Sequence, residues 1–388
     1  MPTHRVLHPH AGGAPDLADD ARSMARALEL AELARGSVEP NPVVGAVVVK
    51  DGVVIGEGYH ARFGGPHAEI IALENAGSAA AGATVYVSLE PCCHSGKTGP
   101  CTKALIAARV ARVVAPMLDA NPLVAGKGIM ELHRSGIGVT VGPQAAAASR
   151  INAPFFKLIT RRRPYVLAKW AQSIDGALAD RHGQSQWISG AESRQQVHRL
   201  RGRVDAIMVG ISTALADDPL LTARPENPAD VRRTAVRCVL DTHCRLPLES
   251  QLVRTAREVP VRIYHAIELN PQAAERREGL LAAGVACRAA GGDNTGLEIG
   301  AILNDLGAEQ KTHLLIEGGG RLLSSFLHAQ AVDEAHVYIA PLLITDPQAC
   351  RPAGGTAEHL AAALRGKIVA HNMSGPDVMI RMLFAGVL

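Results

Sequence analysis

The sequence predicts two consecutive α/β domains, and three observations lead to this prediction. The chain has 388 residues, which is long for one domain. Segments typical of strands and helices alternate twice, once before and once after residues 142–163. That stretch is rich in alanine, then basic at Arg161–Arg163, and is followed by Pro164. We therefore expect a loose extension over 1–18, a first domain over 19–146, a linker over 147–163 and a second domain over 164–388.

Hydrophobic periodicity and turn residues predict the elements of the first domain. Apolar residues repeat at helical spacing after Asp19–Asp20 and stop at Gly36. Lys50-Asp51-Gly52 separates two apolar runs, which indicates a β-hairpin. The next helix, over 67–75, would hold His67 and Glu69 in its first turn. The remaining elements are expected as strand 84–89, helix 101–109, strand 112–115, helix 128–135 and strand 137–141.

The second domain shows the same alternation. Short apolar runs separated by amphipathic segments are typical of strands joined by helices. The expected strands are 165–171, 206–209, 238–240, 261–264 and 313–316, and the expected helices are 192–201, 297–306 and 321–329.

Composition narrows the class of protein. Hydrophobic residues make up 47% of the chain and charged residues 20%, as in soluble globular proteins. A net charge of +3 and 3% aromatic residues do not supply the basic groove and stacking rings that nucleic acid requires. Seven cysteines fit reduced thiols and a metal site better than a disulfide framework. Without a run of about 18 apolar residues or a secretory signal, we expect a cytoplasmic protein that binds neither nucleic acid nor membrane.

The motif His67-Ala68-Glu69, followed by Pro91-Cys92 and Cys101, predicts a zinc site. One imidazole and two thiolates suit zinc, and three protein ligands leave the fourth tetrahedral position for water. Zinc lowers the pKa of such a water towards neutrality. Glu69 can then carry a proton from the water to a departing amine. This ligand order is that of zinc nucleobase deaminases, except that Ser95 replaces the usual second cysteine, so Cys101 must supply that thiolate.

A structural zinc site is the alternative interpretation. Structural sites close all four positions with protein ligands, and Cys93 or His94 could supply the fourth. Neighbouring side chains on an extended loop point apart, which argues against Cys93 beside Cys92. His94 alone is as well explained by loop surface as by substrate contact.

Four motifs resemble, in the same order, the deaminase half of the bifunctional riboflavin biosynthesis enzymes. They are Pro40–Gly45, His67–Glu69, Leu89–Cys101 and Asp119–Gly128. These enzymes join a diaminohydroxyphosphoribosylaminopyrimidine deaminase to a 5-amino-6-(5-phosphoribosylamino)uracil reductase. Cys93 stands where Ser is common and Gly99 where Pro is common. Both departures concern the conformation of the loop and not the ligands.

The resemblance implies a cytidine-deaminase-like three-layer fold and hydrolytic removal of the 2-amino group from 2,5-diamino-6-(5-phosphoribosylamino)pyrimidin-4(3H)-one. It implies Zn²⁺ held by His67, Cys92 and Cys101, with Glu69 as the catalytic proton shuttle. The positions that match the substrate pocket of the family are Asn41, His60, His94 and Lys97.

A glycine-rich turn, Gly318-Gly319-Gly320, follows an apolar run and opens a helix. Backbone amides at such a helix start can bind a phosphate. The turn lacks the spacing of the Rossmann fingerprint, and by itself an ordinary tight turn explains it equally well.

The surrounding motifs resemble the reductase half of the same family over roughly residues 164–385. They are Lys169–Gly176, Ser185–Ile188, Thr213–Arg224, Val332–Glu334 and Tyr338–Pro341. The resemblance implies a dihydrofolate-reductase-like fold and NADPH, which delivers a hydride to C1′ of the sugar and opens it to a ribityl chain. Because the cofactor carries this step, no acid or base is assigned, although Lys169 and Asp175 are candidates.

The resemblance also implies contact residues in the second domain. Those that match cofactor contacts are Ala171, Trp187, Thr213, Asp217, Thr242, Gly319, Gly320, Arg321, Leu322, Leu323, Ser324 and Ser325. Those that match substrate contacts are Ser185, Arg201, Leu221, Arg224 and Glu317. Arg201 and Arg224 could grip the ribose phosphate by charge-assisted hydrogen bonds. Taken singly, each arginine is better explained as a solvated surface charge.

The sequence thus predicts a bifunctional enzyme of small pyrimidine phosphates that assembles as a homo-oligomer, a dimer or tetramer. One alternative is a deaminase of nucleosides or nucleic acid fused to an unrelated α/β domain. Another is a binding module that zinc stabilises and that has no activity.

Overall fold

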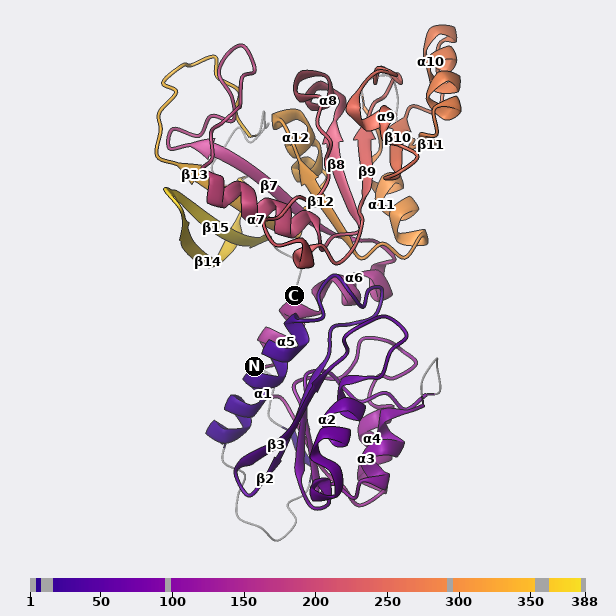
Figure 1. Cartoon of the computed structure of the whole chain (residues 1–388), viewed down its shortest axis with the longest axis vertical. Coiled ribbons are helices and arrows are strands. Elements are labelled where there is room, and N and C mark those ends of the chain that lie inside the picture. The colour runs from indigo at the N-terminus through magenta and orange to yellow at the C-terminus, as the bar shows by residue number, and fades with distance from the viewer. Residues whose placement is uncertain (1–4, 8–16, 95–98, 292–295, 353–362, 385–388) are drawn as a thin grey trace. The chain divides into compact units, whose positions relative to one another are not determined.

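The computed structural model describes residues 5–7, 17–94, 99–291, 296–352 and 363–384. It divides into two compact units, one up to Arg161 and the other from Arg162 onward. Each unit is an α/β structure built on its own sheet (Figure 1).

The first unit contains a six-stranded sheet in the order β1-β6-β5-β4-β2-β3. The three strands β4, β5 and β6 run parallel, whereas β1, β2 and β3 each pair antiparallel with their neighbours. The strands are β1 (Arg5–Leu7), β2 (Gly45–Lys50), β3 (Val53–Tyr59), β4 (Thr84–Val87), β5 (Arg112–Ala115) and β6 (Gly138–Val141). The helices are α1 (Leu17–Glu32), α2 (Ala68–Ala76), the short 3₁₀ helix Gly77–Ala80, α3 (Cys101–Ala107), α4 (Lys127–Arg134), α5 (Ala145–Ile151) and α6 (Ala153–Arg161).

The side chains of this sheet alternate between two cores, which makes the unit three layers thick. Val85 and Val87 of β4 pack with α2, α3 and α4. Tyr86, between them, packs on the opposite face with α1 and α5. Successive strand residues point to opposite faces, so apolar residues at all three positions require helices on both sides.

Three features of this unit differ from the sequence-based expectation. Arg5–Leu7, expected in a loose extension, forms an edge strand paired with β6. His67 is the N-cap of α2 and does not lie in its first turn. Residues 147–163, expected as a linker, fall mostly in α5 and α6, which belong to the first unit. Alanine is the best helix former, so an alanine-rich connection can fold as helix.

The second unit contains a nine-stranded sheet in the order β11-β10-β9-β8-β12-β7-β13-β15-β14. The seven strands from β11 to β13 are parallel, and β15 and β14 continue the sheet antiparallel. The strands are β7 (Tyr165–Ser173), β8 (Ala206–Gly210), β9 (Val236–Leu240), β10 (Val261–His265), β11 (Ala286–Ala289), β12 (His313–Glu317), β13 (Glu334–Ala340), β14 (Gly366–Ser374) and β15 (Asp377–Phe384). The helices are α7 (Ala191–Arg201), α8 (Ile211–Asp217), the 3₁₀ helix Pro228–Asp230, α9 (Gln251–Arg254), α10 (Pro271–Ala282), α11 (Ile299–Ala308) and α12 (Gly320–His328).

Helices cover both faces of this sheet as well. Ile207 and Val209 of β8 pack in one core with residues of α8 and α9, while Met208 packs in the other core with α11 and α12. The sequence did not predict the antiparallel hairpin β14–β15, because β14 is exposed along most of its length and lacks a clear apolar alternation.

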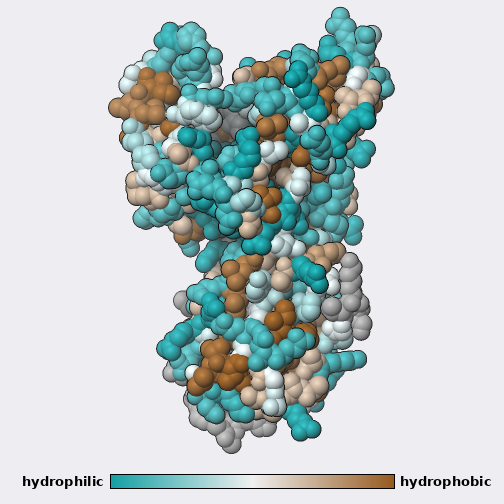
Figure 2. Space-filling view, in the orientation of Figure 1, coloured by the Kyte–Doolittle hydropathy of each residue, from teal (hydrophilic) through white to brown (hydrophobic). Residues whose placement is uncertain are grey.

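Within the part of the chain that the structure describes, no helix is both long and apolar enough to span a membrane. The face shown in Figure 2 is mostly hydrophilic, and its hydrophobic side chains form separate small groups.

Gly58 lets β3 lie directly against α2. A Cβ atom at Gly58 would lie 2.6 Å from the backbone nitrogen of Ala72 and 2.7 Å from the carbonyl oxygen of Ala68. Gly56 is equally tight, with 2.3 Å to the carbonyl oxygen of Ala72. This close contact fixes the helix that follows His67.

We predict that Gly58→Ala lowers the free energy of unfolding by about 1–3 kcal/mol, because backbone must move to admit the methyl group. The matched control is Gly138→Ala in β6, where the nearest atom would be 3.5 Å away, an ordinary contact. Thermal unfolding of the full chain measures both variants. Equal effects at the two positions would contradict the close packing of β3 on α2.

Candidate active sites

Three potential metal ligands converge in the first unit. The Nδ1 atom of His67 lies 3.2 Å from the Sγ atom of Cys101 and 3.5 Å from that of Cys92. All three ligand atoms lie within 4.8 Å of one another. His67 caps α2, Cys92 follows β4, and Cys101 is the first residue of α3. Two helix starts and one strand end thus bring these side chains to one point.

The hydrogen bonds at this point favour a thiolate at Cys92. The backbone N–H of Cys101 donates to the Cys92 sulfur at 3.4 Å, and that of Thr102 donates to the Cys92 carbonyl at 3.2 Å. A hydrogen bond with Cys101, together with one from His67, lowers the pKa of Cys92 to about 4, while the contact between the two sulfurs raises the pKa of Cys101. These contacts favour the thiolate form at Cys92 over that at Cys101.

These donors fit zinc. One imidazole nitrogen and two sulfurs are a typical zinc ligand set, and three ligands leave a position for a reacting molecule. Within the described residues, neither Cys93 nor His94 belongs to the converging group. His94 is exposed, and Cys93 is half-buried with a pKa that burial raises. The geometry therefore favours an open site over a closed structural one.

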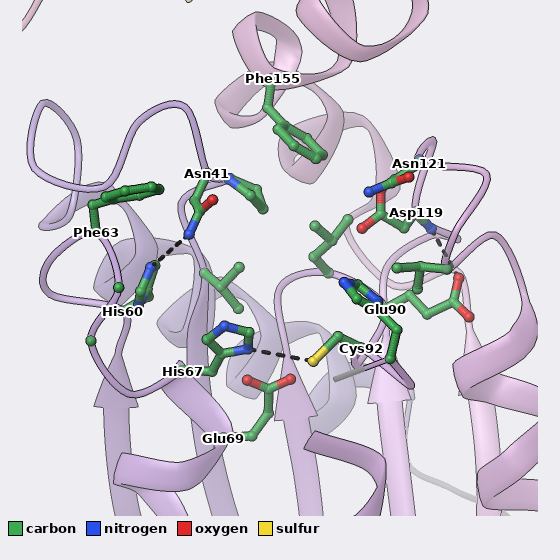
Figure 3. A pocket seen from close by; sticks show the side chains of 17 residues that line it. Asn41, His60, Phe63, His67, Glu69, Glu90, Cys92, Asp119, Asn121 and Phe155 are labelled. Atoms are coloured by element: carbon green, nitrogen blue, oxygen red, sulfur yellow. Dashed lines mark hydrogen bonds between the residues drawn. The ribbon is translucent and has the colours of Figure 1, made fainter. Parts of the chain in front are cut away.

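Glu69 lies beside this group in the first turn of α2. It is 3% exposed, and burial, followed by the charge of Cys92, raises its pKa to about 6. Figure 3 shows its carboxylate next to His67 and Cys92 at the floor of a pocket. A buried carboxylate at this place can hold and release a proton.

His67, Glu69 and Cys92 line a cavity of about 300 Å³, in the size range of small-molecule sites. Asn41, His60 and His94, predicted from the sequence as pocket residues, line it. Lys97 lies outside the described residues. Phe63, Glu90, Asp119, Asn121 and Phe155 also line the cavity. None of them was predicted as a pocket residue, although Glu90, Asp119 and Asn121 lie within the family motifs.

Hydrogen bonds fix His60 and Asn41 in the wall of the cavity. The Nδ1 atom of His60 lies 2.9 Å from the carbonyl oxygen of Pro66, so Nδ1 donates. Its Nε2 atom can then accept from the Asn41 amide at 3.3 Å. Burial lowers the pKa of His60, which favours this neutral form. With its amide nitrogen facing His60, the Asn41 side chain can use its oxygen Oδ1 to accept a hydrogen bond from a ligand.

Asp119 and Asn121 lie on the opposite wall (Figure 3). Burial raises the pKa of Asp119 to about 6, and the charge of Glu90 adds to the effect. Asp119 and Asn121 could have been predicted as pocket residues, because they follow β5 as Cys92 follows β4. The carboxyl ends of these neighbouring parallel strands lie at one edge of the sheet. Phe155 comes from α6, in the segment expected as a linker, and no sequence signal indicated it.

A second site is outlined at the carboxyl edge of the sheet in the second unit. Thr213 follows β8, Thr242 follows β9, and Gly318–Gly320 follows β12. These strands are parallel neighbours, so their ends meet at one edge, where ligands of open α/β sheets bind. The backbone N–H of Gly319 donates to Thr213 Oγ1 at 3.3 Å. Gly318 has a φ of 148°, which favours glycine.

Arg201 and Glu317 form a two-pronged ion pair beside this edge. Arg201 Nε lies 2.7 Å from Glu317 Oε1, and Nη2 lies 2.8 Å from Oε2. Burial alone would raise the pKa of Glu317, but the charge and hydrogen bonds of Arg201 outweigh it and the pKa is lowered. Lys169 is the partner of Glu317 in the β7–β12 register, and burial lowers its pKa.

Arg201 also donates to the carbonyl oxygen of Thr222 at 3.3 Å, which joins the loop of Leu221 and Arg224 to the pair. Arg224 is exposed, and its backbone N–H donates to His198 Nδ1 at 3.2 Å. Leu221 is buried in the core, with a φ of 52°.

The other residues predicted to contact the cofactor or the substrate differ in their exposure and in the elements that carry them. Ala171 lies in β7, Asp217 ends α8, and burial raises the pKa of Asp217. Trp187 is 69% exposed, and the guanidinium of Arg194 lies 4.5 Å from its ring centre. The remaining proposed residues are Ser185 on an exposed loop, Arg321 and Ser325 on the exposed side of α12, Ser324 half-buried, and Leu322 and Leu323 in the core. The two leucines could touch a cofactor only through their backbone.

The first unit thus has the fold and ligand set of a zinc-binding deaminase, and the second has a ligand-binding edge typical of α/β enzymes. Residues 17–117 match the family model described as the cytidine and deoxycytidylate deaminase zinc-binding region. Residues 164–380 match the model described as the RibD C-terminal domain.

Individual relatives cover almost the whole chain. The riboflavin biosynthesis protein RibD of Aquifex aeolicus is 42% identical over 325 residues, 84% of this chain and 88% of its own length. That of Escherichia coli strain K12 is 39% identical over 377 residues, 94% of this chain and 100% of its own. The solved structure of Acinetobacter baumannii RibD (form 2) has a TM-score of 0.82 at 35% identity and covers 96% of this chain and 100% of its own.

The chain belongs to the RibD family of riboflavin biosynthesis proteins. It is a bifunctional enzyme, a zinc-dependent deaminase and a reductase that uses NADPH.

Proposed function

We propose that the two units act on one pyrimidine in succession. The first removes the 2-amino group of 2,5-diamino-6-(5-phosphoribosylamino)pyrimidin-4(3H)-one, and the second reduces the ribosyl group of 5-amino-6-(5-phosphoribosylamino)uracil to ribityl with NADPH. A solved relative from Thermotoga maritima, 31% identical with a TM-score of 0.80 over 95% of this chain and 99% of its own, is named as both this deaminase and this reductase. The observation that carries the first assignment is the convergence of His67, Cys92 and Cys101 beside buried Glu69.

In the first reaction a water oxygen bonds to C2 of the pyrimidine, the bond from C2 to the amino nitrogen breaks, and ammonia leaves. His67, Cys92 and Cys101 would hold the zinc ion, which makes a water nucleophilic near neutral pH. Glu69 takes the proton of the attacking water and returns it to the departing amine. The ring and its substituent are oriented by Asn41, His60 and His94. Lys97, which lies outside the described residues, is proposed for the same role.

In the second reaction NADPH supplies a hydride to C1′, and the ring oxygen of the sugar leaves that carbon and gains a proton. The chain positions the two molecules at the carboxyl edge of the sheet. The proposed cofactor contacts are Ala171, Trp187, Thr213, Asp217, Thr242 and the helix start Gly319–Ser325. The proposed substrate contacts are Ser185, Arg201, Leu221, Arg224 and Glu317. Because Arg201 is engaged by Glu317, Arg224 is the better candidate for the phosphate.

We also propose a cytoplasmic homo-oligomer, a dimer or tetramer. The edge strand β14 supports an assembly, because it carries Ile368 at 56% and Met373 at 63% exposure, and sheet edges offer unpaired backbone groups to another chain.

We predict that Glu69→Gln reduces deamination by at least about 100-fold, because the amide cannot carry a proton. Zinc content should stay at the wild-type level, and NADPH oxidation with the deaminated product should be unchanged. Metal analysis and separate assays of the two reactions measure this. Deamination close to the wild-type rate would remove Glu69 from the mechanism.

For the reductase, Arg224→Ala should raise the KM for the phosphorylated product by about 10- to 100-fold, the effect of losing a charge-assisted hydrogen bond. The KM for NADPH should not change. Arg232→Ala, another exposed arginine of this unit, is the matched control. An equal KM in both variants would place the phosphate elsewhere.

The predicted mass in solution is two or four times 40.8 kDa. Light scattering of the full chain at micromolar concentration measures it. A mass of one chain would contradict the proposed assembly.

A further inference from the structure

Glu90 is a buried carboxylate that the proposed chemistry does not use. It is 4% exposed and lies two residues before the ligand Cys92. Three backbone N–H groups donate to it: that of Asp119 at 3.0 Å and that of Gly126 at 2.8 Å, both to Oε2, and that of Ile129 at 3.2 Å to Oε1. A buried carboxylate that accepts several backbone N–H bonds strongly fixes the segments that donate them.

The loop over residues 119–126 has an internal shape of its own. The Asp119 side chain accepts from the Asn121 N–H at 2.8 Å, and the Asn121 side chain accepts from the Leu123 N–H at 3.1 Å. These Asx turns shape the loop locally. The bonds to Glu90 do something different, because Asp119 begins the loop and Gly126 ends it. One carboxylate therefore ties both ends of the loop to the segment that carries Cys92.

The start of α4 is held against the same segment. A Cβ atom at Gly128 would lie 2.1 Å from the carbonyl oxygen of Pro91 and 3.3 Å from Glu90 Oε1. Ile129, whose N–H reaches Glu90, lies in the first turn of α4. A negative charge is favoured at a helix N-terminus, so the contact is stabilising.

We propose that Glu90 is a positioning residue for the deaminase reaction, which holds Asp119 and Asn121 in the cavity wall at a fixed distance from Cys92. Figure 3 shows Asp119, Asn121 and Glu90 on one side of the pocket, facing Asn41 and His60. The role in catalysis rests on the proposed function, whereas the mechanical role does not. Loss of the tie displaces one wall of the cavity while the metal ligands stay in place.

The test is Glu90→Gln in the full chain. The amide keeps the size of the side chain but replaces one acceptor oxygen by an NH₂ group that faces backbone N–H donors. We expect the KM for deamination to rise by about 10- to 100-fold, because hydrogen bonds between the substrate and the displaced wall weaken, with a smaller change in kcat. Zinc content and reductase kcat/KM should equal those of the wild type.

Glu131→Gln is the matched control. Glu131 lies on α4 and accepts from Thr102 Oγ1 at 2.8 Å, a bond that glutamine can retain. This variant should change the deaminase KM by less than about twofold, within the scatter expected away from a site. Equal KM values for the two variants would overturn the proposal, as would a loss of zinc in proportion to activity.

Hydrogen exchange separates this inference from the proposed function. Glu90→Gln should speed amide exchange at Asp119, Gly126 and Ile129 and leave α3 unchanged. Unchanged exchange at these three amides would refute the positioning role, whatever the activity. If the wild-type chain did not deaminate the pyrimidine, the proposed function would fail while exchange still decided the role of Glu90.

Discussion

The site of the first unit depends on one constraint: the imidazole of His67 and the sulfurs of Cys92 and Cys101 must lie close enough together to bind one metal ion. Each comes from the end of a regular element: His67 caps α2, Cys92 follows β4 and Cys101 starts α3. The close contact of β3 with α2, which only glycine allows, sets where the imidazole lies. Within the described residues no fourth protein ligand joins these three donors, which suits an open site, and we propose that Glu69 beside them moves the proton.

The two units place their chemistry by the same rule. In each, several residues of the site follow parallel strands: Cys92 follows β4 and Asp119 follows β5 in the first unit, and Thr213, Thr242 and Gly318 follow β8, β9 and β12 in the second. Parallel strands end together, so short loops from distant parts of the sequence meet at one edge. The Arg201–Glu317 pair and the Glu90 bonds then fix those loops by charge-assisted hydrogen bonds.

The sequence predicted those elements whose apolar pattern is strong. Strand 112–115 and the starts of the helices at 101 and 191 lie within a residue of their predicted positions, and the RibD family and its two reactions were predicted from motifs. Residues that reach the cavity only through the packing of distant segments could not be predicted from the apolar pattern or assigned to the pocket from a motif. Asp119 and Asn121 reach the cavity only because β5 lies next to β4, and Phe155 does so because an alanine-rich connection folds as helix. Leu322 and Leu323 were predicted as cofactor contacts from the family motif. Their helical spacing with Phe326 on α12 instead directs their side chains into the hydrophobic core.

We propose that one nitrogen and two sulfurs of the chain bind a zinc ion and leave one of its positions open. X-ray absorption at the zinc edge, on protein prepared with its thiols protected, tests this directly. We predict one zinc per chain with two sulfur neighbours at about 2.3 Å and two lighter neighbours at about 2.0 Å, one of which an added inhibitor or anion replaces. A third sulfur, or a fourth protein ligand that no small molecule displaces, would contradict it.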